Sequence, residues 1–297
     1  MASLKEINCS AAAVRVKGAF PFNWDLNAYR GCGHGCKYCY ALYSHDYIDK
    51  RGSYFENIYV KSNVAEKLEE QLQRTSWKKE IINLGGVTDS YQPFEKEYKI
   101  MPEILRIMIK YKNPVIISTK SELILRDFEL FEELSKSAFV CIAATVTCAD
   151  ENMRSKLEPG AAKSSDRFKM IKEFSKAGIH TGIHFMPAIP FLTDNKENIN
   201  GVFERAAECG ADYAVYGMLN LRGKTKGYFT EFMKKEFPEK MDLFVKYFVD
   251  KNYRDAHRAM VYGNIDSAMK KYGVSKDYPE GMMRKGYKEA EQTSLFD

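Results

Sequence analysis

Residues 29–40 read YRGCGHGCKYCY, and this glycine-rich stretch contains three cysteines at spacings of four and then three positions: Cys32, Cys36 and Cys39. A cubane iron–sulfur cluster needs thiolates that converge on one small object from a chain able to wrap around it. The glycines between the cysteines allow positive φ angles and a close backbone approach, so that amide N–H groups can point at the cluster sulfurs. Because a cubane has four irons, three cysteines leave one iron open for a further ligand.

Two other interpretations of these cysteines stay open. His34 lies inside the same stretch and could be the fourth ligand of a zinc ion, although zinc ligands usually come as two separated pairs. Cys36 and Cys39 form a Cys-x-x-Cys pair of the redox type, but a redox pair explains neither Cys32 nor the glycines. The cluster interpretation accounts for more of the stretch than either alternative.

The pattern Cys-x-x-x-Cys-x-aromatic-Cys, with Tyr38 as the aromatic residue, resembles the signature of the radical S-adenosylmethionine (SAM) enzymes. The resemblance implies that the three cysteines hold a [4Fe–4S] cluster whose open iron chelates the amino and carboxylate groups of SAM. One electron would cleave SAM to methionine and a 5′-deoxyadenosyl radical, which abstracts hydrogen from a substrate that the sequence does not identify. The resemblance also implies a one-electron donor such as flavodoxin or ferredoxin. The cofactors would then carry out the radical chemistry.

Composition sets the broad class of the chain. A chain of 297 residues with 45% hydrophobic residues is ordinary for a globular protein and can bury a substantial core. It has no apolar run near the ~18 residues of a membrane span and no signal-peptide pattern at its N-terminus. Seven cysteines, an odd number, argue against a disulfide framework and favour a reducing compartment, so we expect a cytoplasmic protein without a membrane partner.

The net charge of +5 is uneven, since most of the excess comes from residues 221–297. A basic excess can indicate a polyanionic partner such as nucleic acid. It is also typical of a solvated helical surface, and for a chain of this size we favour that interpretation.

Apolar strands alternate with amphipathic helices along most of the chain. The expected strands are 23–29, 80–84, 115–118, 139–146, 180–186 and 213–216. The expected helices are 64–72, 104–111, 127–134, 164–177 and 195–209. Six strand–helix units with short connections predict α/β architecture, a partial (β/α)6 TIM-like barrel with a C-terminal helical extension. The domain boundaries follow as an N-terminal lead-in (1–23), the partial barrel (24–221), and a C-terminal helical region with a polar tail (222–297).

Reactive groups in such barrels gather at the carboxyl ends of the strands. After the second strand, Gly85 and Gly86 allow close backbone approach, and Thr88 and Asp89 could bind an ammonium group, although a plain turn explains the same residues. Lys120, after the third strand, could pair with a carboxylate such as that of SAM, or could be a solvated lysine. The remaining candidates are Ser121 beside it and Thr145 on the fourth strand, whose small face leaves room for a ligand or belongs to the core.

Further motifs resemble the spore photoproduct lyase-like branch of the radical SAM superfamily over roughly residues 24–220. They are TDSYQP (88–93), TKS (119–121), RD (126–127) and EPG (158–160). The resemblance implies that Tyr38 lies beside the SAM adenine and that Gly86, Thr88 and Lys120 surround the methionine moiety. Tyr38 and Tyr40 match the tyrosines that take part in the lyases' catalytic relay. Gly85-Gly86 stands where the lyases have their hydrogen-donor cysteine, which is a departure from their pattern.

Three hypotheses for function follow. The first is a radical SAM enzyme that abstracts hydrogen from an undetermined substrate. The second is a DNA-repair lyase or nucleic-acid modification enzyme of the photoproduct-lyase type, which would bind its polyanion in a salt-dependent way. The third is a non-catalytic iron–sulfur or zinc protein, which makes little use of the polar residues at the strand ends.

Overall fold

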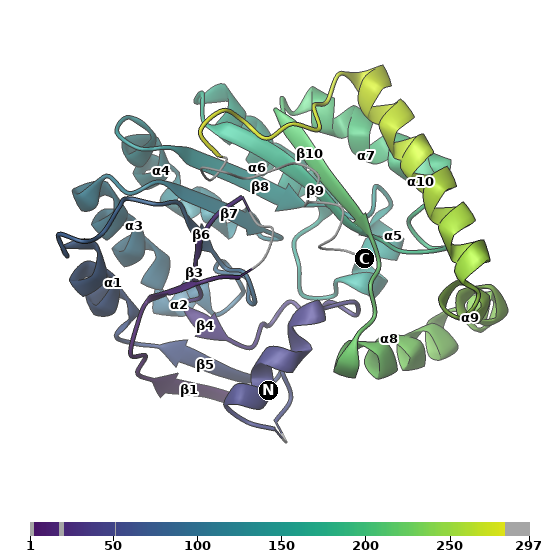
Figure 1. Cartoon of the computed structure of the whole chain (residues 1–297), viewed down its shortest axis with the longest axis horizontal. Coiled ribbons are helices and arrows are strands. Elements are labelled where there is room, and N and C mark those ends of the chain that lie inside the picture. The colour runs from purple at the N-terminus through teal and green to yellow at the C-terminus, as the bar shows by residue number, and fades with distance from the viewer. Residues whose placement is uncertain (1–2, 18–20, 51, 283–297) are drawn as a thin grey trace.

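A seven-stranded sheet forms the centre of the computed structural model, which describes residues 3–17, 21–50 and 52–282 (Figure 1). In spatial order the strands are β10 (Tyr213–Met218), β9 (His180–Ala188), β8 (Val140–Thr145), β7 (Val115–Thr119), β6 (Ile82–Leu84), β3 (Trp24–Leu26) and β2 (Ala13–Arg15). Strands β10 to β3 pair in parallel, and β2 is antiparallel to β3 at the edge. Six parallel strands in an open sheet confirm the predicted partial (β/α)6 barrel.

Five main helices connect the parallel strands and cover the outside of the sheet (Figure 1). They are α1 (Val64–Leu72), α3 (Ile100–Tyr111), α4 (Phe128–Ser135), α6 (Ser164–Lys176) and α7 (Lys196–Glu208). Their apolar stripes are fully buried at positions such as Leu68, Ile104 and Phe174, because burial of apolar area against the sheet is what stabilises an amphipathic helix. Short helical turns interrupt the connections: α2 (Glu95–Tyr98), η2 (Glu122–Asp127) and α5 (Glu151–Leu157).

A second, three-stranded sheet differs from the single first strand expected over 23–29. Its strands are β1 (Ser3–Ile7), β5 (Asn57–Lys61) and β4 (Tyr29–Arg30). The chain leaves the main sheet after β3 because Asn27 turns its side chain to donate to Asp25 (2.7 Å) and to accept from the Val87 N–H (2.9 Å). The cysteine stretch therefore begins on β4, beside the main sheet, and ends in the 3-10 helix η1 (Tyr40–Tyr47).

The predicted C-terminal helical extension is present. It consists of α8 (Gly223–Glu236), η3 (Pro238–Lys240), α9 (Met241–Val249) and α10 (Lys251–Tyr272), and α10 packs on α7 (Figure 1). Tyr216 of β10 donates to Asp266 of α10 at 2.6 Å, which joins the extension to the sheet. The polar tail expected after these helices lies largely in 283–297, outside the described residues. Within the described part of the chain, no helix is long and apolar enough to cross a bilayer.

The inner face of the sheet changes character from one end of the strands to the other. Near the amino ends, five side chains are packed together and buried, and we call them the barrel floor: Ile116, Cys141, Tyr213, Val215 and Met282. Towards the carboxyl ends, Ser118, His184 and Met186 are only partly buried. The floor is thus closed by packing, and the side chains able to meet a ligand lie at the carboxyl edge of the sheet.

Candidate active site

The cysteine stretch is held over the carboxyl edge of the sheet by its first glycine. Gly31 has φ +80°, and a Cβ there would come within 2.8 Å of two backbone oxygens, so only glycine fits without rearrangement. Its carbonyl accepts a hydrogen bond from the Thr88 hydroxyl at 2.7 Å, and the Cys32 N–H donates to the Tyr54 carbonyl at 3.1 Å. Thr88, predicted as a cofactor contact, therefore fastens the loop to the turn after β6.

The three cysteines of the loop share one environment. Cys32 and Cys36 are buried, and Cys39 is half-buried. Burial raises the pKa of each thiol to about 12, and mutual repulsion adds to this because Cys36 interacts electrostatically with both others. Among the described residues, no three His, Cys, Asp or Glu side chains are grouped tightly enough to hold a single metal ion. Three thiols on one loop are the donor set that iron–sulfur centres use, so the residues fit such a group.

Asp89 joins the cysteine loop to the end of β7. Its carboxylate lies 3.1 Å from His34 Nε2 and accepts from the Thr119 hydroxyl (2.7 Å) and the Lys120 N–H (2.8 Å). The Tyr91 N–H is a further donor at 2.9 Å. Burial alone would raise the pKa of Asp89, but His34 and these donors outweigh burial and hold it well below its usual range. Three hydrogen-bond donors and the His34 contact surround the carboxylate, which makes Asp89 an anchor of the loop.

A buried ion pair fixes the orientation of Tyr38. The Tyr38 hydroxyl donates to Glu158, and Glu158 pairs with Arg167 of α6 at 2.5 Å, both charges being fully buried. Thr147 donates to the same carboxylate at 3.0 Å. Burial opposes ionisation of Glu158, but Arg167 and Lys120 more than offset it, so its pKa is lowered. These contacts hold the Tyr38 ring in one orientation and occupy its hydroxyl, so only the faces and edges of the ring remain available to contact a ligand.

Lys120 reaches towards the cysteines from the end of β7. Its ammonium nitrogen lies 5.9 Å from the centroid of the Tyr38 ring. Burial disfavours the charged form, but Cys36, Glu158 and Asp89 outweigh this and raise the pKa of Lys120. Lys120 is consequently a fixed positive charge beside the cysteine loop.

Tyr40 and Gly86 lie together on the other side of the loop. The Tyr40 hydroxyl donates to the Gly86 carbonyl, while 61% of the Tyr40 side chain remains exposed. The Gly86 N–H donates to Asp25 at 3.0 Å, and a Cβ on Gly86 would meet that carboxylate at 2.4 Å. Asn83 donates to the same carboxylate at 2.8 Å, and burial raises the pKa of Asp25. A glycine is thus required at position 86 for this contact.

The other predicted site residues are of two kinds: some lie on the inner face of the barrel, and others make hydrogen bonds that stabilise the loops. Thr145 lies on the inner face, with its hydroxyl 3.2 Å from that of Ser118. His184 lies beside it on β9, its Nε2 3.4 Å from the Tyr213 hydroxyl, and burial together with Lys120 lowers its pKa to about 4. Ser121, by contrast, caps η2 by accepting from the Leu123 N–H at 3.3 Å. Gly85 has φ +96°, which allows the tight turn after β6, and its N–H donates to the Leu26 carbonyl of β3 at 2.8 Å.

Sequence reasoning gave no individual role to several residues that organise the site. They are Asp25, Glu158, Arg167 and His184. Asp25 and His184 could have been noticed as polar residues inside apolar strands, where a buried polar group needs a partner. The Glu158–Arg167 pair offers no such signal, because a spacing of nine residues across a loop has no fixed geometry.

The family model of the radical SAM superfamily matches residues 26–201. An uncharacterised protein of Mycobacterium tuberculosis is 31% identical to this chain over 92% of this chain and 82% of that protein. An uncharacterised protein of Methanocaldococcus jannaschii is 27% identical over 84% of this chain and 93% of that protein.

Solved structures share the fold at low sequence identity. A spore photoproduct lyase with bound AdoMet and dinucleoside spore photoproduct has a TM-score of 0.67 and 12% identity, covering 93% of this chain and 82% of the lyase. Streptococcus suis SuiB bound to its precursor peptide SuiA has a TM-score of 0.50 and 16% identity, covering 79% of this chain and 47% of SuiB. These likenesses show a shared fold.

Proposed function

The chain belongs to the radical SAM superfamily, and on this premise we propose that it binds a [4Fe–4S] cluster through Cys32, Cys36 and Cys39 and reductively cleaves SAM. The observation that carries the proposal is the position of the cysteine loop, which lies at the carboxyl edge of six parallel strands with Lys120 beside it. Such a cluster, when bound, supplies one electron to SAM and so generates the 5′-deoxyadenosyl radical that abstracts hydrogen from substrate.

In this proposal Lys120 pairs with the SAM carboxylate. An ammonium that is kept charged beside the cysteines can form a charge-assisted bond with a carboxylate brought there. Thr145 adds a hydroxyl on the adjacent strand, and Gly86 offers backbone without a side chain in the way. Their roles are to bind and orient SAM.

The tyrosines have different roles because their hydroxyls are held differently. Tyr38 is buried and bonded to Glu158, so we assign its ring to packing beside the SAM adenine. Tyr40 is exposed and bonded only to a backbone carbonyl in the contacts that the structure gives it, so its O–H is the one that can exchange hydrogen with a bound molecule. We assign Tyr40 as the catalytic tyrosine of the pair.

Four of the predicted cofactor contacts act in this proposal by holding the loops in place. Thr88 and Asp89 fasten the cysteine loop, Gly85 closes the turn after β6, and Ser121 caps η2. Each of these side chains or backbone groups already has a protein partner, which pre-organises the residues that would touch SAM.

Substrate choice rests on the inner face of the barrel. The Gly85–Gly86 turn carries no thiol, so a lyase-type return of hydrogen would need another donor. A nucleic-acid substrate remains the second candidate, supported by the fold shared with a lyase that holds a dinucleoside.

The test is anaerobic reconstitution with iron and sulfide, followed by dithionite and SAM, with 5′-deoxyadenosine as the readout. We expect product from the wild type, none from Cys36→Ala, and wild-type levels from Cys209→Ala, which removes a buried cysteine at the carboxyl end of α7. Equal product from Cys36→Ala, or zinc bound in place of iron with no SAM binding, would contradict the proposal. Adding single-stranded DNA to the same assay tests the nucleic-acid candidate, since a substrate should increase product formation.

A further inference from the structure

Reductive cleavage of SAM needs an electron from outside the chain, and the structure limits where it can enter. The inner side of the cysteine loop faces Lys120 and the Tyr38–Glu158 pair, which the proposed function reserves for SAM and substrate. The barrel floor is filled by packed side chains. The outer side of the loop is covered by η1 and α8, which lie against each other (Figure 1).

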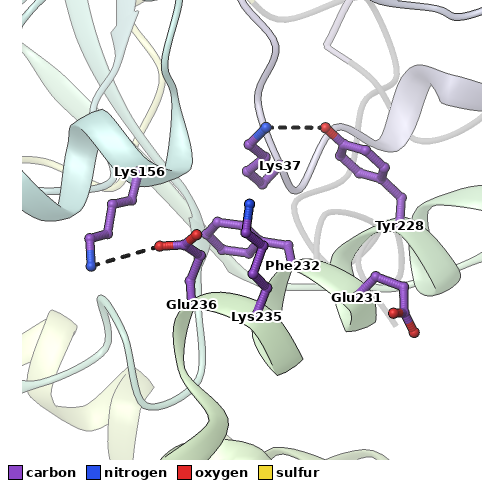
Figure 2. Close-up of a pocket in the computed structure, with 7 residues that line it drawn as sticks. All are labelled: Lys37, Lys156, Tyr228, Glu231, Phe232, Lys235 and Glu236. Atoms are coloured by element: carbon purple, nitrogen blue, oxygen red, sulfur yellow. Dashed lines mark hydrogen bonds and ion pairs between the residues drawn. The ribbon is translucent and has the colours of Figure 1, made fainter.

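A surface groove of about 450 Å³ lies on that outer side (Figure 2). We call it the lysine groove, and it is lined by Lys37 of the cysteine loop, Lys156 of α5, and Tyr228, Phe232, Lys235 and Glu236 of α8, with Glu231 at its rim. Figure 2 shows Lys37 and Lys235 near the Phe232 ring, with the Glu236 carboxylate between that ring and the Lys156 ammonium. Three lysines and two glutamates thus line the groove, and its aromatic side chains, Tyr228 and Phe232, both come from α8.

The groove is joined directly to the cysteines. Lys37 stands between Cys36 and Tyr38 in the chain, and its ammonium lies 3.3 Å from the Tyr228 hydroxyl. Phe232 packs against the apolar cluster that includes Cys36 and Tyr38. Thr225, near the start of α8, donates to the Cys39 carbonyl at 2.8 Å. Lys37, Phe232 and the Thr225 contact thus connect the groove to the cysteine loop.

The charge around the groove favours an acidic partner. Lys156 is 48% exposed and its ammonium is 4.0 Å from Glu236, a pair that is too open to neutralise it fully. Glu231 pairs with Lys234 at 2.9 Å, while Lys235 and Lys226 are exposed on the same helix, so lysines outnumber glutamates along α8. An aromatic centre with a basic rim is the arrangement of small, transient interfaces that electrostatic attraction steers.

We propose that the lysine groove is the docking site of an acidic one-electron carrier protein that reduces the cluster, an inference that rests on the proposed function. The reduced carrier loses one electron and the iron–sulfur centre on the cysteine loop gains it. No bond forms between the proteins, and no proton crosses the interface. Electron-transfer encounters of this kind bury less than about 1,200 Å² and exchange rapidly, which suits a shallow groove.

The experiment compares two charge-reversal variants in binding to an acidic flavodoxin. Lys156→Glu/Lys235→Glu reverses the lysine groove. The control, Lys169→Glu/Lys172→Glu, makes the same charge change in a second basic groove between α6 and α7, which is lined by Phe168 and Arg205 and has no contact with the cysteine loop. The dissociation constant is measured by biolayer interferometry at low and high salt, on chains whose folding is checked by circular dichroism.

We expect the lysine-groove variant to bind flavodoxin about tenfold more weakly or worse than wild type, and the control to bind as wild type does. Wild-type binding should weaken with salt, because screening shortens the reach of surface charges. With reconstituted enzyme, 5′-deoxyadenosine formation should fall in the groove variant when flavodoxin is the reductant and stay unchanged with dithionite. If the wild type formed no 5′-deoxyadenosine with dithionite, the proposed function would be contradicted. The flavodoxin binding data would still test the docking site independently.

Two results would overturn the docking proposal. One is flavodoxin binding that is equal in both double variants, whether both keep it or both lose it. The other is a short DNA oligonucleotide that binds wild type and is lost only in the lysine-groove variant while flavodoxin binding is unchanged, which would assign the groove to nucleic acid.

Discussion

The two ends of the barrel are stabilised by opposite means. At the carboxyl edge many side chains are polar or charged and are held by hydrogen bonds and ion pairs, as in the buried pair of Glu158 and Arg167. At the barrel floor the side chains are mostly apolar and are held by packing around Tyr213. Polar networks fix geometry but are costly if one partner is lost, whereas apolar packing tolerates change in proportion to the volume removed. The difference indicates that the edge is built for positioning and the floor for stability.

The largest effect should come from breaking the buried pair at the edge. Arg167→Met removes the ion-pair partner of the buried Glu158 carboxylate, so we expect the free energy of unfolding to fall by about 3–5 kcal/mol in urea titrations. The double variant Arg167→Met/Glu158→Gln should recover part of that loss. The matched control is Lys176→Met on the same helix, whose exposed pair with Glu173 at 2.9 Å should matter by less than about 1 kcal/mol. An equal effect of both single variants would refute the contrast between buried and exposed pairs.

The next effect tests the floor. Ile116→Ala removes buried methyl groups among packed neighbours, and we expect a loss of about 2–4 kcal/mol in the free energy of unfolding. Because the floor is remote from the cysteine loop, the iron content after reconstitution should match that of wild type. If Ile116→Ala kept the wild-type free energy of unfolding but bound no iron, the roles assigned to the two ends would be reversed.

A smaller effect on stability is expected when either of two glycines with similar backbone angles is replaced by alanine. Gly31 (φ +80°) and Gly178 (φ +75°) both favour glycine, but a Cβ would clash with backbone only at Gly31. Gly178→Ala should cost about 1 kcal/mol, the price of the left-handed conformation alone. Gly31→Ala should cost more and should also lower the iron bound per chain, because the Thr88 contact to the Gly31 carbonyl is displaced. Similar iron binding in both variants would show that the cysteine loop is not held by this glycine.

The fold could largely be predicted from the sequence, whereas most contacts within the site could not. Six strand–helix units could be predicted because apolar periodicity is local, and the cysteine loop could be placed at a strand end for the same reason. The contact of His34 with Asp89 joins residues far apart in the chain, and no periodicity encodes it. The separation of β4 from β3 was likewise hidden, since it depends on Asn27 reaching Asp25 and Val87. The cover that α8 gives to the loop is a third contact of this long-range kind.

The smallest effect concerns His184, which lies between the two ends. Burial and Lys120 lower its pKa to about 4, so the folded state binds its proton more weakly than the unfolded state does. Its contribution to stability is present above the unfolded pKa of about 6.5 and is lost as pH falls from there towards 4. We expect its imidazole signals in NMR titrations, assigned with His184→Gln, to show the neutral form down to pH 5. A titration midpoint near pH 6.5 would mean that solvent reaches His184 on the inner face of the barrel.

The most direct test of the central claim is the iron and sulfide content, with the visible and EPR spectra, of three reconstituted chains. They are the wild type, Cys36→Ala at the edge and Cys141→Ala at the floor. We predict about four irons per chain and a [4Fe–4S] spectrum in the wild type and in Cys141→Ala, and loss of both in Cys36→Ala. A cluster that survives in Cys36→Ala, or that is lost equally in Cys141→Ala, would contradict the assignment of the cysteine loop as the reactive centre.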